Sequence, residues 1–206
     1  MKHVHQLFLS LIVISVLLIG CDSEPTNPDE ADPDIGENGP TPGEVTISIS
    51  GDVEDEKTGT ALFSGAGVGG NEHSWGILID DSDPGPHTYN FQLLFTDSDE
   101  DPIDQPEAGT YNIGNHVHTD DPDSPVFSGA YVDLEAGIPY MSLTELCGGE
   151  YAHTGTLTIN SATEAVITGS FEFDAFYSNA EDCDEGIMST TITIAGEFAA
   201  ENPFAQ

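Results

Sequence analysis

The sequence predicts an all-β protein with a single antiparallel β-sandwich or barrel-like domain. Three observations predict this class. Apolar and polar residues alternate repeatedly from residue 44 onward, turn-forming residues interrupt the chain every 8 to 15 positions, and no stretch after the leader has a clear 3.6-residue apolar period. The roughly 160 residues of 44–206 are enough to bury one substantial core.

The chain begins with a leader. Lys2 is followed by Leu7–Ile19, a run of 13 residues that is apolar except for two serines. A helix of this length is too short to span a bilayer, which needs about 20 residues. The run fits the apolar region of a secretory signal peptide, which we predict over residues 1–20.

Leu18-Ile19-Gly20-Cys21 at the end of the leader resembles the lipobox of bacterial lipoproteins. This resemblance implies that Cys21 is acylated and becomes the first residue after cleavage. Buried acyl chains contribute about 0.8 kcal/mol per methylene, so a multiply acylated cysteine is a firm anchor. We therefore expect a protein anchored to the outer membrane or the cell surface, with the periplasmic face as an alternative. The competing interpretations are an ordinary signal peptide with a chance cysteine and a failed transmembrane segment.

Residues 21–43 have the composition of a disordered tether. Between Asp22 and Gly43 the chain has five prolines, seven acidic residues and one aliphatic residue, Ile35. Such a segment cannot bury enough apolar surface to order itself, and its charges repel one another. We expect it to hold the domain of residues 44–206 away from the membrane.

The alternation predicts the strands in chain order, each with one buried face. The polar partners are mostly threonine and serine, which favour strands. The residues expected on the buried face are Val45, Ile47, Ile49; Trp75, Ile77, Ile79; Tyr89, Phe91, Leu93, Phe95; Phe127, Gly129, Tyr131; Leu157, Ile159; Ile167, Gly169, Phe171, Phe173; and Ile192, Ile194, Gly196, Phe198.

Residues 108–113, 155–160, 167–175 and 192–198 include Gly-Thr-Leu-Thr-Ile-Asn and Ile-Thr-Gly-Ser-Phe-Glu-Phe. These stretches resemble β-rich lipoproteins of Bacteroidota-type bacteria. The resemblance implies a lipoprotein with a β-fold and implies no activity.

The charge of the chain is strongly one-sided. Against 38 acidic residues there are two lysines, Lys2 and Lys57, and no arginine, for a net charge of −36. This excludes nucleic-acid binding, which needs a basic surface. Repulsion among so many like charges destabilises a compact domain. In molar salt the Debye screening length falls to about 3 Å, and the repulsion is largely removed. We therefore expect a protein adapted to high salt; an acidic calcium-binding protein and a merely soluble acidic surface are the alternatives.

Cys147 and Cys183 remain once Cys21 is assigned to lipid. An even pair in an exported protein predicts one disulfide. Closing a loop of this length constrains the unfolded chain by roughly 3–4 kcal/mol. A reactive thiol is the alternative, although neither cysteine has a basic neighbour in sequence to lower its pKa.

Carboxylates gather in segments that we expect between the strands. Asp97, Asp99 and Asp101 offer three oxygens at alternating positions, which suits calcium. The segment is not an EF-hand loop, because Pro102 and Ala108 stand where that loop needs glycine and glutamate. The other clusters are 52–56, 80–83, 120–123 and 181–185. A plain solvated acidic loop is the alternative at each.

His116 and His118 form the sharpest motif for a transition metal. Side chains at i and i+2 of a strand point to the same face, so both could ligate one ion. The ligands that could complete such a site are His73, His87, His153 and Asp120. The spacing resembles the His-x-His of cupins and copper–zinc superoxide dismutases, but the downstream ligands of both families and the arginine of the second are missing. Surface histidines on a polar turn are the alternative.

Aromatic side chains could form a platform for a glycan. Most of them, including Trp75, Tyr89 and Tyr131, stand at the alternating positions expected on the buried face of their strands. Such positions favour a place in the core over a place in a binding site. Tyr140 and Tyr151 are less clearly placed and are the candidate ligand-binding residues.

These observations favour a non-enzymatic lipoprotein of the cell envelope, with a binding or structural β-domain whose partner is an envelope protein or a glycan. The first alternative is a metal-binding protein or metal-dependent enzyme that uses His116 and His118. The second is a calcium-stabilised adhesion or glycan-binding module.

Overall fold

The computed structural model describes residues 39–69, 72–81, 87–97, 105–114, 126–142, 153–177 and 190–205, without the side chains of 66–69, 72–73, 96–97 and 153. All of these residues belong to the unit Asp32–Gln206. Within them there is no helix long and apolar enough to cross a membrane.

The described residues form ten strands and no helix, which confirms the all-β prediction. The strands are β1 Glu44–Gly51, β2 Asp55–Gly69, β3 Glu72–Asp80, β4 Tyr89–Asp97, β5 Gly109–Gly114, β6 Val126–Asp133, β7 Ile138–Met141, β8 His153–Ala162, β9 Val166–Tyr177 and β10 Thr190–Glu201.

The strand pairings close into a ring. From β2 the sheet continues through β3, β4, β6, β5, β8, β9 and β10 to β1, which pairs back onto β2. Neighbours in this ring are antiparallel except for β5 and β6, which run parallel. The short strand β7 pairs with β6 and also touches β9. The domain is therefore a flattened, barrel-like structure.

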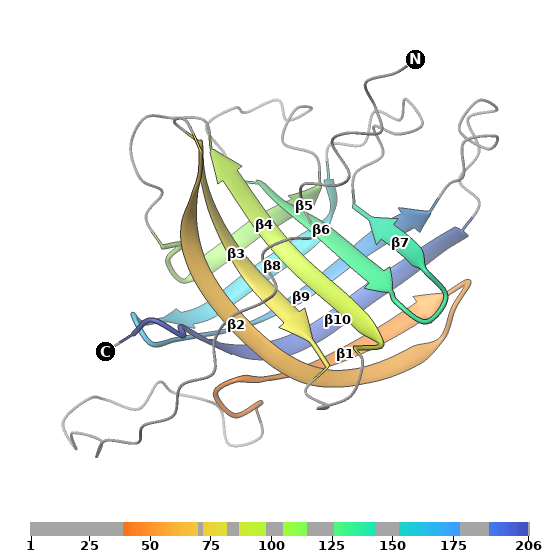
Figure 1. Ribbon diagram of the computed structural model, residues 1–206, viewed down its shortest axis with the longest axis horizontal. Coiled ribbons are helices and arrows are strands. Elements are labelled where there is room, and N and C mark those ends of the chain that lie inside the picture. Colours follow the sequence, from red (N-terminus) through yellow and green to blue (C-terminus); the bar gives the residue numbers. More distant parts are fainter. Residues whose placement is uncertain are drawn as a thin grey trace. The chain divides into compact units, whose positions relative to one another are not determined.

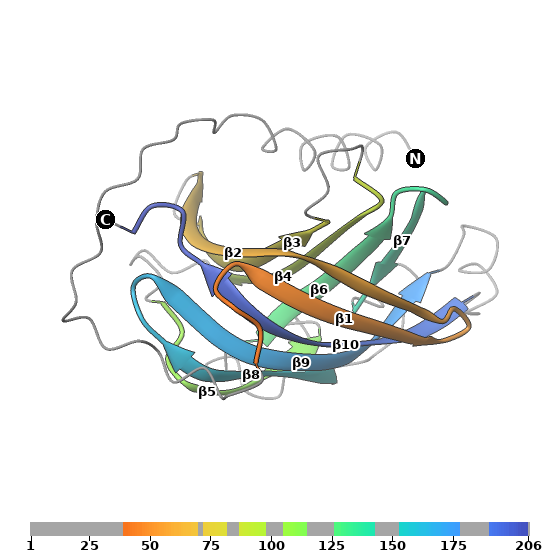
Figure 2. The same cartoon turned by 90° about the horizontal axis from the view of Figure 1, so that it is seen from below.

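Figures 1 and 2 show this structure as two layers whose strands cross at a steep angle. One layer contains β2, β3, β4, β6 and β7, and the other contains β5, β8, β9, β10 and β1. The sheet continues from one layer to the other through the antiparallel pair β1–β2 and through the parallel pair β5–β6.

The core lies between the layers and contains the residues that alternation predicts, together with others that it does not predict, among them Phe63, Ile113 and Tyr140. Of the residues expected on the buried face, all the aliphatic ones are at most 4% exposed, and Phe95 alone among the aromatic ones is only partly buried. Phe91 lies at the centre, with ring centroids 4.9 Å from Phe171 and 5.8 Å from Phe173. Burial of each such side chain contributes about 1.5–3 kcal/mol.

Glycines in the strands make room for these rings. A Cβ atom on Gly129 would lie 2.6 Å from the ring of Phe173, and one on Gly196 would lie 2.6 Å from the ring of Phe171. In both cases the ring belongs to another strand. These two glycines thus serve the packing of rings from other strands.

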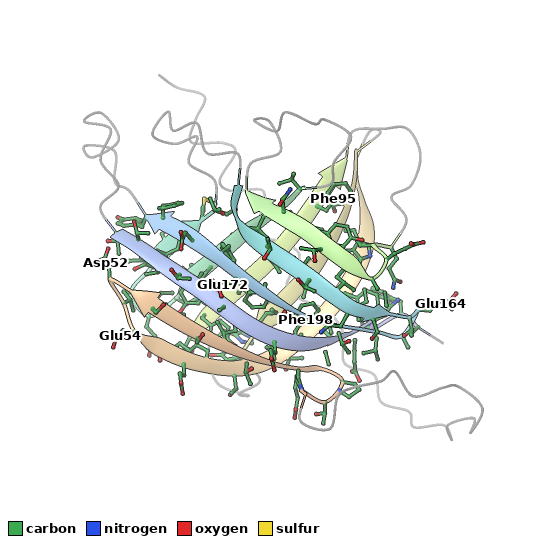
Figure 3. The ribbon with its side chains drawn as sticks, turned by 180° about the vertical axis from the view of Figure 1, so that it is seen from behind. Asp52, Glu54, Phe95, Glu164, Glu172 and Phe198 are labelled. Atoms are coloured by element: carbon green, nitrogen blue, oxygen red, sulfur yellow. The ribbon has the colours of Figure 1, made fainter. Side chains whose placement is uncertain are left out.

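Some acidic residues expected in connections lie in strands instead. Asp55 and Glu56 begin β2, Asp80 ends β3 and Asp97 ends β4. The prediction was wrong at these positions because charged residues fit the solvated ends of strands as well as turns. Asp52 and Glu54 lie in the β1–β2 connection at one end of the domain, and Glu164 lies at the opposite end (Figure 3).

Candidate binding groove

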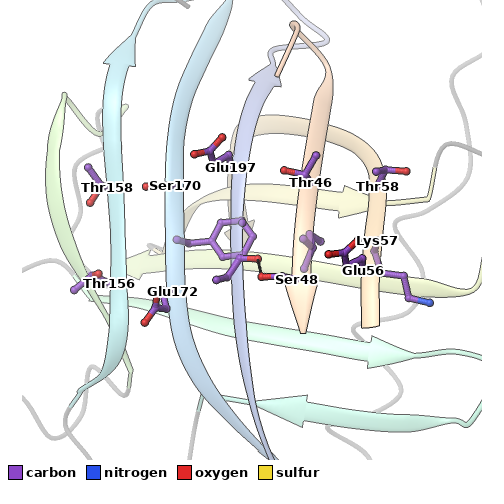
Figure 4. Close-up of a pocket in the computed structure, with 14 residues that line it drawn as sticks. Thr46, Ser48, Glu56, Lys57, Thr58, Thr156, Thr158, Ser170, Glu172 and Glu197 are labelled. Carbon is purple, nitrogen blue, oxygen red and sulfur yellow. Dashed lines mark hydrogen bonds between the residues drawn. The ribbon is translucent and has the colours of Figure 1, made fainter. Parts of the chain in front are cut away.

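A shallow groove of about 660 Å³ crosses the outer face of β8, β9, β10, β1 and the first part of β2 (Figure 4). Its lining is mostly hydroxyl-bearing and acidic. The residues are Thr46, Ile47, Ser48, Glu56, Lys57, Thr58, Thr156, Thr158, Ser170, Phe171, Glu172, Ala195, Gly196 and Glu197. We call this surface the groove.

The alternation that builds the core also builds the groove. Residues between the buried positions point outward, and strand register aligns them in two rows across the sheet. The first row runs Thr158, Ser170, Glu197, Thr46, Thr58. The second runs Thr156, Glu172, Ala195, Ser48, Glu56.

The centre of the groove is hollow because its side chains there are small. Ala195 faces outward between Glu172 and Ser48, and the next residue is Gly196. Beneath Gly196 the ring of Phe171 fills the core and is 3% exposed. The groove thus has an apolar floor under polar walls.

Most hydroxyls of the groove are available to a ligand. Thr46, Thr58, Thr156 and Ser170 make no side-chain hydrogen bond with another described residue, whereas Ser48 Oγ donates a long bond of 3.4 Å to the Ala195 carbonyl. Each hydroxyl can donate one hydrogen bond and accept two. The rows therefore present donors and acceptors at the spacing of neighbouring strands, about 4.8 Å.

The groove is negative. Glu56, Glu172 and Glu197 have no cationic partner among the described residues, whose ion pairs are Lys57–Asp55 and His87–Asp81. Lys57 borders the groove, but its Nζ lies 2.7 Å from Asp55 Oδ2. That hydrogen bond raises the pKa of Lys57 and lowers the pKa of Asp55. The lysine is thus already neutralised by its own chain.

A second polar cluster lies at the end of the core beside Lys57. The rings of Tyr89, Tyr131, Tyr140 and Tyr177 follow one another at centroid distances of 6.1, 6.1 and 6.2 Å. Burial raises the pKa values of Tyr89 and Tyr131 far above the ordinary range, and nearby carboxylates raise them further. These phenols therefore stay protonated; Tyr89 donates its hydrogen to the Thr58 carbonyl at 3.0 Å.

Most of the predicted site residues lie outside the described part of the chain. These are Cys21, Asp99, Asp101, His116, His118, Cys147, Tyr151 and Cys183, so lipidation, the disulfide and the metal sites stay predictions. Asp97 ends β4, where its backbone pairs with that of His73. Tyr140 is 4% exposed and packs between Tyr131 and Tyr177, as part of the core.

Of the histidines suggested as additional ligands, His87 has a partner of its own. Its Nδ1 lies 2.6 Å from Asp81 Oδ1. His153 begins β8, opposite Gly114 at the end of β5. Within the described residues, no three histidine, cysteine or acidic side chains are grouped so that they could hold a metal ion.

Sequence reasoning missed the groove, although its elements were visible. The motifs Thr-Ile-Ser-Ile-Ser at 46–50 and Thr-Leu-Thr-Ile at 156–159 show alternating hydroxyls. What the sequence lacks is the register that sets these strands side by side. No protein-family model, curated protein or solved structure matches this chain.

Proposed function

We propose that the chain is an exported lipoprotein, anchored through Cys21, whose β-domain is a non-enzymatic binding module of the cell envelope adapted to high salt. The groove is the surface with which it binds, and its ligand is a neutral glycan. The observation that carries this proposal is the lining of the groove, with free hydroxyls from β8, β9, β1 and β2 in register on either side of β10 and acidic side chains among them.

The chemistry of the groove suits a neutral glycan better than other ligands. Hydroxyls of a sugar exchange hydrogen bonds with threonine and serine, and donate to carboxylates, which accept only. An anionic ligand would be repelled by Glu56, Glu172 and Glu197. In molar salt both this repulsion and the attraction for a cation are largely screened, whereas short hydrogen bonds to a neutral ligand persist.

The experiment compares glycan binding by groove variants. The full-length protein is titrated with neutral glucan, mannan and xylan oligosaccharides in molar salt, with a chitosan oligosaccharide as the cationic comparison. Thr46→Ala with Ser48→Ala removes two hydroxyls from the hollow, and each lost hydrogen bond weakens binding up to about tenfold. Ser50→Ala, at the next outward position of β1 and outside the groove, should leave binding unchanged.

Binding of a neutral oligosaccharide that the double variant weakens and Ser50→Ala does not would support the proposal. If no oligosaccharide binds, or if both variants bind like the wild type, the groove is not the binding surface.

A further inference from the structure

The groove has the form of a track with two walls. Every residue of its two rows lines it, and the register line between the rows forms its floor, with Phe171, Gly196, Ile47 and Lys57. In Figure 4 one row runs from Thr158 to Thr58 and the other from Thr156 to Glu56, both across the strands. A ligand that follows the walls therefore lies across β8, β9, β10, β1 and β2, and not along any one of them.

Strand geometry sets the dimensions of this track. Neighbouring strands lie about 4.8 Å apart, so the track is about 19 Å long from β8 to β2. The rows are two residues apart along each strand, which separates them by about 6.8 Å. Each strand gives one polar side chain to each wall, except that β10 contributes Ala195 to the second. The track thus repeats its polar groups once per strand.

An extended chain of β-1,4-linked pyranose rings matches this repeat. Its links are equatorial, so each ring advances the chain by close to one strand spacing, about 4.8 Å. Such a chain is a flat ribbon, with hydroxyls at its two edges and C–H groups on its faces. The edge hydroxyls reach the two rows, where they exchange hydrogen bonds. One face lies over Ala195 and Gly196, where the groove is hollow.

Other neutral glycans fit the track less well. An α-1,4-linked chain coils, so that it leaves the rows after a few rings, and a branch would meet a wall. Stacking on one exposed ring cannot replace the contacts along the rows. Phe171 is the only aromatic residue among the described ones that line the groove, and it is 3% exposed. Affinity therefore comes from hydrogen bonds added ring by ring.

The described residues leave both ends of the track open. Beyond β8 the first row continues onto β5 with Thr110, whose hydroxyl lies 3.5 Å from that of Thr158. At the other end, residues 55–59 of β2 pair with β1 and with no other described strand. An open track admits an internal stretch of a long chain as readily as a chain end.

We infer, on the premise that the groove binds a neutral glycan, that its ligand is an internal stretch of a linear β-1,4-linked polysaccharide. About four rings lie across the strands, one for each interval between neighbouring strands. The hydroxyls of one edge of the ribbon bind the row from Thr158 to Thr58, and those of the other edge bind the row from Thr156 to Glu56.

The test is isothermal titration of the full-length protein in molar salt, in a detergent without a sugar headgroup. The ligands are β-1,4-linked gluco-, manno- and xylo-oligosaccharides of two to six rings. In at least one series the dissociation constant should fall by about two- to tenfold for each ring up to about four, and change little beyond. An α-1,4-linked gluco-oligosaccharide of six rings should bind about tenfold more weakly than the best β-linked one, or worse.

Thr158→Ala and Thr58→Ala remove hydroxyls from the two ends of the first row. Each should weaken binding of the tetrasaccharide more than binding of the disaccharide, because a short ligand avoids the altered end. Thr60→Ala, at the next outward position of β2 and outside the groove, is the matched control and should change neither. Thermal unfolding by circular dichroism checks that the variants fold.

The outcomes separate this ligand class from the proposed function. If no neutral oligosaccharide binds, or if Thr46→Ala with Ser48→Ala has no effect, both are wrong. If binding depends on Thr46 and Ser48, but a disaccharide binds as tightly as a hexasaccharide or the α-linked series binds equally well, the glycan site stands and the linear β-1,4-linked ligand is overturned. Equal losses of affinity in Thr58→Ala and Thr60→Ala would overturn the placement of the ligand along the rows.

Discussion

Gly155 illustrates how tightly β8 lies against β9. It stands opposite Phe173 in the register of the two strands. A Cβ atom on Gly155 would lie 2.0 Å from the Glu172 carbonyl oxygen and 2.3 Å from Phe173 Cα. Both are backbone atoms, so the conflict can be relieved only by moving the strands.

We therefore predict that Gly155→Ala lowers the free energy of unfolding by about 1–3 kcal/mol, the usual range for overpacking. Gly65→Ala is the matched control, because its Cβ would meet the Trp75 ring at 3.4 Å and the Ser74 carbonyl oxygen at 3.8 Å, both ordinary distances. Urea unfolding of both variants measures the difference. If Gly155→Ala and Gly65→Ala had equal free energies of unfolding, the close approach of β8 to β9 at Gly155 would be contradicted.

His87 and Asp81 form an ion pair whose strength depends on pH. The hydrogen bond that His87 donates to the Asp81 carboxylate raises the pKa of His87, and the charges of Asp80 and Asp81 add to the effect. Burial works to raise the pKa of Asp81, but hydrogen bonds from Thr88 and His87 outweigh it and lower the pKa. Both partners are therefore charged between the lowered pKa of Asp81 and the raised pKa of His87.

The stability that this ion pair contributes should decrease as the pH rises. The contribution of His87 to stability is complete below its ordinary pKa of 6.5 and disappears as pH rises through the raised value. We predict that Asp81→Asn lowers the pKa of His87 towards 6.5, measured by NMR titration of the imidazole protons. Asp174→Asn, on β9, should not change it. An unchanged titration of His87 in Asp81→Asn would contradict the pairing.

At the scale of strands, alternation predicts the buried faces well because burial of one face imposes a period of two. It misses β2, where Gly59, Gly65, Gly67 and Gly69 interrupt the apolar pattern. It also misses β5 and β7, which have only six and four residues. Glycine and short length weaken a periodic signal even where neighbouring strands supply the pairing.

The groove could not be predicted from the sequence for a related reason. Thr156, Glu172 and Ser48 are far apart in the chain and meet only through the registers of β8–β9–β10–β1. Alternation along a strand tells on which face of the sheet a side chain lies, but not which residues of the adjacent strands lie beside it. The closure of the ring through the parallel pair β5–β6 is likewise a property of the whole fold.

The proposed disulfide belongs to this scale too. Cys147 precedes β8 by six residues and Cys183 follows β9 by six, and antiparallel pairing puts these two strand ends at the same end of the pair. We predict that reduction lowers the free energy of unfolding by roughly 3–4 kcal/mol. Denaturant unfolding with and without reductant measures this loss, and Cys147→Ser should show it without reductant. Two free thiols in the native oxidised protein, in addition to any at Cys21, would contradict the pairing.

For the whole molecule, the proposed anchor makes a direct prediction. Cys21→Ala should abolish incorporation of labelled fatty acid and move the exported protein from the membrane fraction to the soluble fraction. Cys147→Ala is the control and should remain in the membrane fraction. Membrane association that persists in Cys21→Ala would show that another part of the chain provides it.

The chain as a whole has a net charge of −36, and the described residues of its β-domain include one lysine, Lys57, which is already paired with Asp55. The carboxylates of the groove and of the strand ends therefore repel one another without compensation from the chain itself. Screening by salt removes this repulsion, since the Debye length falls from about 10 Å at 0.1 M to about 3 Å at 1 M. Stability in brine underlies the proposed function as a whole.

The most direct test is the thermal unfolding of the full-length protein as a function of salt. We predict that Tm rises steeply from about 0.1 M to 1 M sodium or potassium chloride, by about 2–4 °C for each kcal/mol gained. Millimolar calcium should add nothing beyond sodium chloride of equal ionic strength. A Tm that is highest in low salt, or that rises only with calcium, would contradict adaptation to high salt and favour a calcium-stabilised domain instead.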